Sequence, residues 1–312
     1  MQLTLTNKEI TNAKPFLKWA GGKTQLLEDL EKRLPQQIIA DRIIENYVEP
    51  FVGGGAMFFY LKKNFNVKSA YLFDINPELV LGYTTIKKSN KELIRILHDM
   101  ENEYLSKNVT DRSVYFYQVR NSYNEEDKQF DYKKYSDKWI ERTAKLIFLN
   151  KTCFNGLFRQ NSKGEFNVPF GKYKNPTICD ENNITEVSRA LKGVSIICGD
   201  FGKTSRYIQK GTLVYLDPPY RPLNNTSSFT DYSKDGFGDE EQKRLAMFYK
   251  KMDKKGAYLI LSNSDPKNEN PNDNFFDELY RGYNINRVRA NRMINCQAEG
   301  RGYISELIIT NY

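Results

Sequence analysis

Short apolar runs rich in β-branched and aromatic residues alternate with segments of helical periodicity along this chain. Helical patterns such as Ala56–Lys62 and Asp239–Met252 separate the runs. Strands that alternate with helices in this way predict an α/β fold with a doubly wound, mostly parallel sheet, whose ligands bind beyond the carboxyl ends of the strands. The runs predicted to be strands are Arg42–Pro50, Ser69–Asp74, Val194–Cys198, Leu213–Asp217, Ala257–Ser262, Tyr283–Val288 and Ser305–Thr310.

Residues 82–192 interrupt this alternation. They are polar and rich in Lys, Asn and Tyr, with helical patterns at Lys91–Leu105 and Ser136–Leu149 and a loop-rich end at Lys151–Pro176. We therefore expect residues 82–192 to form an inserted, mostly helical domain, and residues 1–81 and 193–312 to form the sheet domain. Asp265–Asn274 and Asn291–Gly302 have the composition of mobile loops.

Composition narrows the classes of partner and of chemistry. The chain has 47 Lys and Arg against 39 Asp and Glu, a formal charge of +8, and 13% aromatic residues. This balance suits nucleic-acid binding, although an ordinary basic surface around an aromatic core has the same composition. The single histidine, His98, excludes histidine metal cages and Ser-His-Asp catalysis, and the dispersed cysteines argue against zinc. With no long apolar run and no signal-peptide pattern, we expect a soluble, cytoplasmic protein without a metal or a membrane partner.

A glycine-rich turn, Glu49–Gly55, follows the first predicted strand and precedes a helical pattern. Glycines let a ligand approach the backbone closely, and a helix N-terminus favours a carboxylate. About twenty residues later, Asp74 closes the next strand, where a carboxylate accepts hydrogen bonds from ribose hydroxyls. The pair indicates a nucleotide-type cofactor, but it suits NAD as well and does not identify the cofactor.

The N-terminal segment Lys18–Thr24 (KWAGGKT) ends like a phosphate-binding loop. That motif requires a glycine at the position where this chain has Leu17. No strand clearly precedes the segment either, so we reject a nucleotide triphosphatase.

The segment Asp217-Pro218-Pro219-Tyr220 follows a hydrophobic strand, which carries it to the ligand edge of the sheet. The prolines impose a rigid, extended turn and remove backbone donors, so carbonyls can face outward as acceptors. The Asp217 carboxylate and the Pro218 carbonyl can then accept from an aromatic amino group, which localises the nitrogen lone pair for in-line attack on a methyl sulfonium. Tyr220 can stack on the target ring, which must leave the duplex to reach such a pocket. The structural alternative is an N-capping aspartate before a Pro-Pro turn.

Asn155–Arg159 and Phe166–Tyr173, within the inserted region, are predicted to form a hairpin with glycine-containing turns. Arginine can bind guanine O6 and N7 in the major groove, and apolar groups can contact the thymine methyl. A surface hairpin without any DNA contact has a similar composition, so this chemistry alone leaves both readings open.

With these motifs in this order, the chain resembles the Dam family of N6-adenine DNA methyltransferases with the α-type motif order. It is especially similar to the DpnM-like GATC methylases. The cofactor glycines come first, the insertion next and the Asp217–Tyr220 motif last. The resemblance covers nearly the whole chain, and it rests on Pro15–Lys23, Glu49–Gly55, Phe73–Asn76, Asn155–Tyr173, Gly199–Phe201, Asp217–Tyr220 and Ile304–Tyr312.

The resemblance implies a Rossmann-like methyltransferase sheet with an inserted target-recognition domain. It implies transfer of a methyl group from S-adenosylmethionine to N6 of a flipped adenine in duplex 5′-GATC-3′, with S-adenosylhomocysteine as product. The catalytic residues are then Asp217, Pro218, Pro219 and Tyr220. The implied cofactor site comprises Trp19, Lys23, Phe51, Gly53, Gly55, Asp74, Asp200, Phe201 and Asp217, with Lys23 on the methionine carboxylate and Asp200 facing the cofactor adenine. The implied DNA-recognition residues are Lys18, Phe154, Asn155, Leu157, Arg159, Pro169, Lys172 and Tyr173.

Two details qualify the implied recognition set. Phe154 would lie near the disrupted base stack. Lys172 stands where many relatives carry arginine, and because lysine cannot make the planar two-pronged contact, a phosphate contact is the expectation there.

Three other functions share parts of this pattern. An RNA adenine methyltransferase would keep the chemistry, but duplex RNA hides its major groove from side chains such as those of the hairpin. A non-catalytic DNA-binding protein would have little reason to keep Asp217–Tyr220 intact, and a nicotinamide dehydrogenase leaves that motif unexplained. We expect a monomer that acts on double-stranded DNA of a prokaryotic cell or phage. A cognate restriction endonuclease that forms no stable complex with it is a partner consistent with this function.

Overall fold

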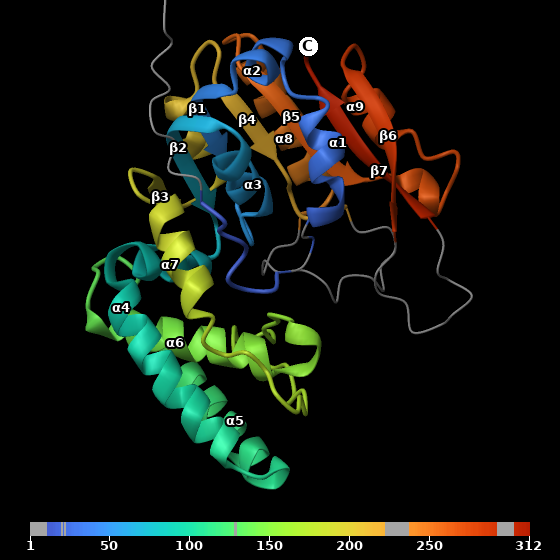
Figure 1. Cartoon of the computed structure of the whole chain (residues 1–312). Helices are drawn as coiled ribbons and strands as arrows, with labels where there is room; N and C mark the ends of the chain where they lie inside the picture. The colour runs from blue at the N-terminus through green and yellow to red at the C-terminus, as the bar shows by residue number, and fades with distance from the viewer. Residues whose placement is uncertain (1–10, 20, 22, 128–129, 222–236, 292–302) are drawn as a thin grey trace, which may run out of the picture. The chain divides into compact units, whose positions relative to one another are not determined.

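A computed structural model describes residues 11–19, 21, 23–127, 130–221, 237–291 and 303–312 (Figure 1). Internal contacts divide the chain into two compact units. The helical unit comprises Met1–Gly22, Gly53–Lys63 and Asn76–Cys198. The sheet unit comprises Lys23–Val52, Asn64–Ile75 and Gly199–Tyr312.

Seven strands form one mixed sheet. They are β1 (Ile43–Glu49), β2 (Asn66–Asp74), β3 (Ser195–Cys198), β4 (Leu213–Leu216), β5 (Tyr258–Ser264), β6 (Asn284–Asn291) and β7 (Tyr303–Thr310). Their order is β3-β2-β1-β4-β5-β7-β6. The pairs β1–β2, β1–β4 and β4–β5 are parallel, whereas β7 is antiparallel to both β5 and β6. All the predicted strands are confirmed with small shifts at their ends, including the final pair.

The direction of the strand order reverses between β1 and β4, which lie side by side. Tyr47 and Val48 of β1 face Leu213 and Val214 of β4 in the register. At such a switch point the chain leaves the carboxyl ends of two neighbouring strands in opposite directions, which opens the crevice where α/β sheets bind ligands. The sequence places the Asp217–Tyr220 motif directly after β4, at this point.

The core of the sheet unit explains why β4 is apolar throughout. All four residues of β4 are buried, as expected for a central parallel strand that is covered on both faces. Helix α8 (Asp239–Asp253) begins with three acidic residues and ends with Lys250 and Lys251, which complement its dipole. Its Leu245, Tyr249 and Met252 belong to the same buried cluster as residues of β4, β5 and β7. The remaining elements in the described part of this unit are the 3₁₀ helices η1 (Thr24–Leu26), η3 (Phe201–Tyr207) and η5 (Pro266–Asn268) and the helices α1 (Leu27–Glu31), α2 (Gln36–Asp41) and α9 (Phe275–Leu279).

The segment Asp265–Asn274 differs from the mobile loop that its composition predicts. Asp265 is only 1% exposed, and its carboxylate pairs with Arg287 of β6 over 2.8 Å. Asp273 pairs with Arg221 over 2.7 Å. Cations distant in the sequence therefore hold the segment in place, which local composition does not reveal. The other predicted mobile loop, Asn291–Gly302, lies outside the described residues apart from Asn291.

The helical unit contains α3, which precedes β2, and the described elements between β2 and β3. Helix α4 begins after Asn76, which accepts from the Glu78 N–H, and Pro77 occupies its first turn. The described helices of this unit are α3 (Ala56–Asn64), α4 (Pro77–Ser106), α5 (Val109–Asp127), α6 (Asp137–Thr152), η2 (Phe154–Gly156) and α7 (Glu181–Ala190), and its bounds also include β3. None of the helices in the described residues combines the length and the apolar character needed to cross a membrane.

Residues 82–192 are thus mostly helical, as predicted. Helix α5 was not predicted, because its apolar residues do not recur at the spacing of one helix face. The domain boundaries at residues 82 and 192 stay a prediction, since the compact helical unit also takes in residues 53–63 and part of the N-terminal segment.

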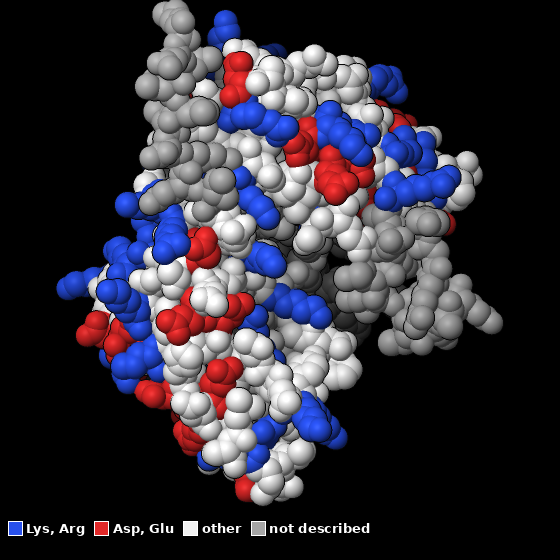
Figure 2. Space-filling view, in the orientation of Figure 1, with Lys and Arg blue, Asp and Glu red and all other residues white. Residues whose placement is uncertain are grey.

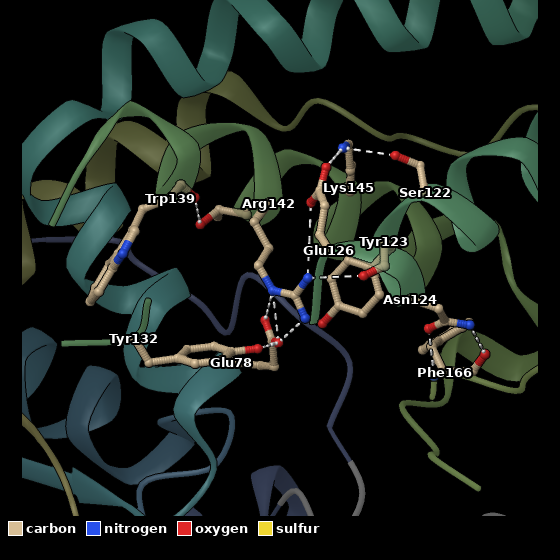
Figure 3. A network of polar contacts seen from close by, with 11 residues as sticks. Glu78, Ser122, Tyr123, Asn124, Glu126, Tyr132, Trp139, Arg142, Lys145 and Phe166 are labelled. Carbon is tan, nitrogen blue, oxygen red and sulfur yellow. Dashed lines mark hydrogen bonds and ion pairs between the residues drawn. The ribbon is translucent and has the colours of Figure 1, made fainter. Parts of the chain in front are cut away.

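A buried ion pair fastens the helices of this unit together (Figure 3). Arg142 of α6 is fully buried, and its guanidinium donates to the Glu78 carboxylate at the start of α4. The same guanidinium donates to the backbone carbonyl of Tyr123 in α5 over 2.9 Å and lies over the Tyr123 ring. Tyr132 also donates to Glu78. This network therefore connects three helices through one charged side chain.

Candidate active site

The carboxylate of Asp217 has its hydrogen-bond donors on one oxygen. Ser262 of β5 donates through Oγ to Asp217 Oδ1 over 2.9 Å, and Lys23 Nζ lies 2.9 Å from the same oxygen. Among the described residues, no group donates to Oδ2. The protein therefore fixes one oxygen of Asp217 and leaves the other as an acceptor.

A hydroxyl chain lies behind Asp217. The hydroxyl oxygen of Tyr215 is 2.9 Å from Ser262 Oγ. Because a carboxylate only accepts, the single proton of Ser262 must point to Asp217, and Tyr215 must donate to Ser262. Both residues are buried, and burial raises the pKa of Tyr215 well above its ordinary value. The chain Tyr215 to Ser262 to Asp217 is thus directional and keeps its protons at neutral pH.

Tyr220 is partly exposed, and its hydroxyl is anchored by hydrogen bonds. Lys23 Nζ donates to the Tyr220 hydroxyl over 2.6 Å, and this hydroxyl donates to Glu306, whose two carboxylate oxygens both lie at 3.0 Å. Lys23 and Glu306 are buried, whereas Tyr220 is 37% exposed. The sheet unit therefore holds the polar end of Tyr220, with the Lys23 ammonium 4.2 Å from the ring centroid, and leaves part of the residue exposed.

Lys23, Asp217, Tyr220 and Glu306 form a cluster in which opposite charges stabilise each other. Burial alone would lower the pKa of Lys23, but Asp217, Tyr220 and Glu306 raise it above its ordinary value. Burial raises the pKa of Tyr220 and of Glu306, and Lys23 opposes both shifts. At neutral pH the lysine is an ammonium and the tyrosine is neutral, so the tyrosine hydroxyl is able to donate to Glu306.

Sequence reasoning did not assign Glu306 or Ser262 to the site. Glu306 is the only acid in the apolar strand β7. A carboxylate in a buried strand is rarely unpaired, so its position in the sequence already indicates a hydrogen-bond or ion-pair partner inside the protein. Ser262 offers no comparable signal, because a serine in a strand is common.

Aromatic rings and an ion pair surround the other predicted cofactor residues of the sheet unit. Phe51 packs on Phe201 and Phe237, with ring centroids 5.4 and 5.6 Å apart. Arg244 of α8 binds both carboxylate oxygens of Asp200, at 3.0 and 2.6 Å, and lies over the Phe201 ring. These hydrogen bonds from Arg244 hold the pKa of Asp200 below its ordinary value. Arg244 is a further residue that sequence reasoning did not assign.

The backbone brings Asp74 and Asp200 to adjacent strand ends. Asp74 closes β2, and its carbonyl accepts the N–H of Gly199 over 2.9 Å. The sheet unit therefore gathers Lys23, Phe51, Asp74, Asp200, Phe201 and Asp217 from the predicted cofactor set.

Trp19, Gly53 and Gly55 belong to the helical unit, where they lie close together. A Cβ atom added to Gly53 would lie 3.2 Å from Cδ1 of Trp19. Gly55 has φ +73°, and a Cβ there would lie 2.5 Å from the Tyr83 hydroxyl, so only glycine fits. Trp19 also stacks on Phe158, with ring centroids 5.0 Å apart. The indole thus packs between the glycine turn and the loop that follows α6.

The predicted hairpin is present as two isolated bridges instead of a regular ladder. Cys153 pairs with Phe170, and Gln160 pairs with Phe166, both antiparallel. Its turn is closed by the Gly164 N–H, which donates to Asn161 O over 2.9 Å. The antiparallel arrangement is confirmed, although the two bridges are not joined into a continuous ladder.

Several predicted recognition residues are exposed on this hairpin. Phe154 is 53% exposed and Tyr173 is 40% exposed. Arg159 donates through Nε to Asn167 Oδ1 over 2.8 Å, and within the described residues its two terminal nitrogens have no hydrogen bond. The guanidinium is therefore oriented by Asn167 and keeps two donors for a ligand.

The backbone of the hairpin adopts left-handed conformations at two of the predicted positions. Asn155 has φ +58° and Lys172 has φ +56°. Asparagine tolerates this region, whereas lysine is uncommon there. Pro169, also predicted, accepts the N–H of Phe154 over 2.8 Å through its carbonyl. The hairpin and its base thus collect Phe154, Asn155, Leu157, Arg159, Pro169, Lys172 and Tyr173.

The positive charge of the chain is distributed. Figure 2 shows Lys and Arg side chains across the face in view, with Asp and Glu side chains among them. Many are local pairs, such as Arg95 with Glu92 and Lys243 with Glu240. The charge therefore favours a polyanionic partner in general and does not by itself mark the contact surface.

Comparison with protein families identifies the family to which the chain belongs. The model of the D12 class N6 adenine-specific DNA methyltransferases matches residues 19–294, which include the glycine turn, the hairpin and Asp217–Tyr220. The chain belongs to this family. The expected resemblance to adenine methyltransferases is confirmed, and the activity is that of an adenine-specific DNA methyltransferase, EC 2.1.1.72. A nicotinamide dehydrogenase is thereby excluded.

Relatives of this D12-class methyltransferase are similar over almost their whole length. "Type II methyltransferase M.MjaIII" of Methanocaldococcus jannaschii is 49% identical, over 96% of this chain and 99% of its own. "Type II methyltransferase M1.LlaDCHI" of Lactococcus lactis is 38% identical over 99% of both chains. The "DNA adenine methylase" of Escherichia coli K12 is 30% identical over 94% of this chain and 93% of its own.

Membership in the family implies an S-adenosylmethionine-dependent enzyme with a DNA substrate. The donor set of the sheet unit fits that cofactor chemically. Carboxylates suit ribose hydroxyls and an adenine amino group, aromatic faces suit a purine, and the buried Lys23 ammonium suits a carboxylate. The close-packed glycine turn of the helical unit, where a Cβ at Gly55 would clash, is a second feature typical of such sites.

Proposed function

We propose that this methyltransferase modifies N6 of an adenine in duplex 5′-GATC-3′, after the base has left the helix. The unshared Oδ2 of Asp217 and the partly exposed Tyr220 carry the chemistry of the proposal, and the resemblance to GATC methylases carries the target sequence. A flipped adenine that stacks on Tyr220 presents its amino group to an acceptor of this kind. Unstacking the base costs on the order of a few kcal/mol, which the contacts of the pocket must offset.

Each residue of the Asp217–Tyr220 motif then has a definite task. Asp217 Oδ2 accepts one amino hydrogen, and the Pro218 carbonyl accepts the other. Both bonds draw the nitrogen toward tetrahedral geometry and localise its lone pair. Pro219 keeps the turn rigid, and its carbonyl accepts from Gln242 over 3.2 Å. Tyr220 supports the ring from one face.

We assign the cofactor contacts by chemistry. When bound, S-adenosylmethionine supplies the electrophilic methyl group, and S-adenosylhomocysteine is the product. Asp74 binds the ribose hydroxyls, Asp200 the adenine amino group, and Lys23 the methionine carboxylate. Asp217 borders the same site. The aromatic residues Trp19, Phe51 and Phe201 and the glycines Gly53 and Gly55 complete the set.

Recognition of the target falls to the hairpin and Lys18. The two terminal nitrogens of Arg159, oriented by Asn167, match guanine O6 and N7. Asn155, Leu157, Pro169 and Tyr173 contact further base edges, and Phe154 fills the space near the disrupted stack. Lys172 binds a phosphate. We further propose that residues 82–192 act as the target-recognition domain.

The biological setting is proposed from the relatives. Two of them are named type II methyltransferases, so protection of DNA from a cognate restriction endonuclease fits this chain. We propose a monomer that forms no stable complex with that nuclease, because one copy holds the complete set of predicted residues.

An oligonucleotide methylation assay tests the proposal. The full-length protein should transfer labelled methyl from S-adenosylmethionine to a GATC duplex and protect that duplex from a methylation-sensitive GATC nuclease. Duplexes with each position of the site changed, a duplex with inosine in place of the adenine, and the RNA duplex serve as controls. Equal transfer to a scrambled site would refute the GATC assignment and leave the adenine chemistry intact.

A further inference from the structure

The side-chain amide of Asn150 clamps two separate segments of the helical unit. Asn150 lies near the end of α6 and is 1% exposed. Its Oδ1 accepts the backbone N–H of Lys18 over 2.9 Å, and its Nδ2 donates to the Lys18 carbonyl over 3.0 Å. The same Nδ2 donates to the Gly156 carbonyl over 2.9 Å. One buried amide thus holds the N-terminal segment and the loop after α6 in one register.

The two clamped segments also touch directly. Gly156 has φ +63°, and a Cβ there would lie 2.9 Å from Cδ of Lys18. The aliphatic stem of Lys18 therefore packs on Gly156, between Asn155 and Leu157 in the sequence. A shift of either segment would displace the other, because no side chain separates them.

We propose that Asn150 is a positioning residue for target recognition, which sets where Lys18 and the loop Asn155–Leu157 meet the bases. The inference rests on the proposed recognition roles of these residues, and it adds a residue that touches no DNA itself. Asn150 satisfies both donors and its acceptor oxygen with backbone groups, so its own rotamer is fixed. A buried amide with all its partners costs free energy to disturb, which makes the clamp rigid.

Asn150→Asp provides the test, since it keeps the shape and the acceptor but removes both donors. The full-length variant is compared with the wild type for kcat/KM on the preferred duplex and on duplexes with single base changes. We expect the ratio of these values to fall roughly 5- to 30-fold, the equivalent of losing about 1–2 kcal/mol. Lys18 precedes Trp19, which is assigned to the cofactor, so the assays are run at saturating S-adenosylmethionine and the discrimination ratio is the readout.

Asn183→Asp is the matched control. Asn183 of α7 makes the same two-point amide contact with the same N-terminal segment, at Lys14, through bonds of 2.9 and 3.1 Å. Its replacement removes the equivalent donor at Lys14, four residues before Lys18. We expect Asn183→Asp to leave the discrimination ratio as in the wild type.

The outcomes separate this inference from the function it rests on. A wild-type enzyme without any site preference would refute the proposed recognition function. If the wild type discriminates but Asn150→Asp lowers kcat/KM equally on all duplexes, Asn150 has only a structural role and the inference is wrong. Should Asn150→Asp fail to fold by circular dichroism, Asn150→Ser, which is too short to reach Gly156, takes its place under the same criterion.

Discussion

Ser262 and Asp217 are linked by a 2.9 Å hydrogen bond that joins the inside of β5 to the first residue after β4. The register of the two strands makes this contact possible, because Leu216 pairs with Leu261 and the next residues follow side by side. The bond holds Oδ1 of the carboxylate and thereby aims Oδ2. In the proposed mechanism, this orientation decides where the adenine amino group is bound.

Replacing Ser262 by alanine should therefore lower kcat while leaving DNA binding close to wild type. A hydrogen bond to a charged group contributes about 1.5–3 kcal/mol, so we expect kcat to fall roughly 10- to 150-fold. Tyr215→Phe, which removes the donor behind Ser262, should have a smaller effect in the same direction. Ser264→Ala on the same strand is the control, and an unchanged kcat in Ser262→Ala would show that Asp217 is oriented by other groups.

Replacing Asp217 by alanine should nearly abolish turnover. Loss of one preorganised group at a reacting centre typically costs about 10²–10³ in kcat, and Asp217 is proposed to hold the nucleophile itself. Single-turnover methyl transfer and a DNA-binding titration measure the two effects separately. Asp239→Ala removes a carboxylate that pairs with Arg221 outside the proposed site and should leave turnover unchanged. Turnover near the wild-type rate in Asp217→Ala would remove this residue from the mechanism.

Replacing Arg159 by alanine should cost about 1–3 kcal/mol of discrimination at one base pair, as loss of a two-pronged guanine contact does. Competition between duplexes with single changes in the preferred site measures this value. Arg95→Ala, on the surface of α4, should have no effect on discrimination. If Arg159→Ala weakens binding to every duplex by the same factor, Arg159 contacts the phosphate backbone.

Glu306→Gln tests how the charge of the buried Glu306 carboxylate, which accepts from Tyr220, affects stability at different pH values. Burial raises the pKa of Glu306 in the folded protein above its ordinary value of 4.5. The folded state then binds a proton more tightly than the unfolded state, so the contribution of Glu306 to stability is full below pH 4.5 and is lost as pH rises through its folded pKa. Relative to Glu306→Gln, the free energy of unfolding of the wild type should fall over this interval, by at most about 1.4 kcal/mol per pH unit.

Urea unfolding of both proteins at several pH values between 4.5 and neutral gives this difference directly. Parallel curves for the two proteins would mean that Glu306 titrates like an exposed carboxylate.

Glu78→Gln should destabilise the helical unit by about 3–5 kcal/mol, because it leaves the buried Arg142 charge without its main partner. Urea unfolding followed by circular dichroism measures the loss. Glu92→Gln breaks an exposed ion pair with Arg95 and should leave the midpoint almost unchanged, since water screens that pair. Similar small changes in both variants would indicate that water reaches Arg142.

The sequence by itself determined the order of the motifs along the chain and the family, and it predicted the chemistry of Asp217–Tyr220. These features are local: a strand is read from a short apolar run, and the motif is continuous in the chain. For the same reason, the helical character of residues 82–192 and the antiparallel hairpin were predictable, although the interruptions of the hairpin ladder were not.

Only the tertiary structure decided which groups surround these motifs. Ser262, Glu306, Arg244 and Asn150 act on residues 45, 86, 44 and 132 positions away in the chain. No local pattern specifies such pairs, because they depend on strand register and on which helix face is buried. The same reason explains Asp265–Asn274. Its polar composition predicts a mobile loop, but ion pairs with Arg221 and Arg287 hold its acidic residues in place.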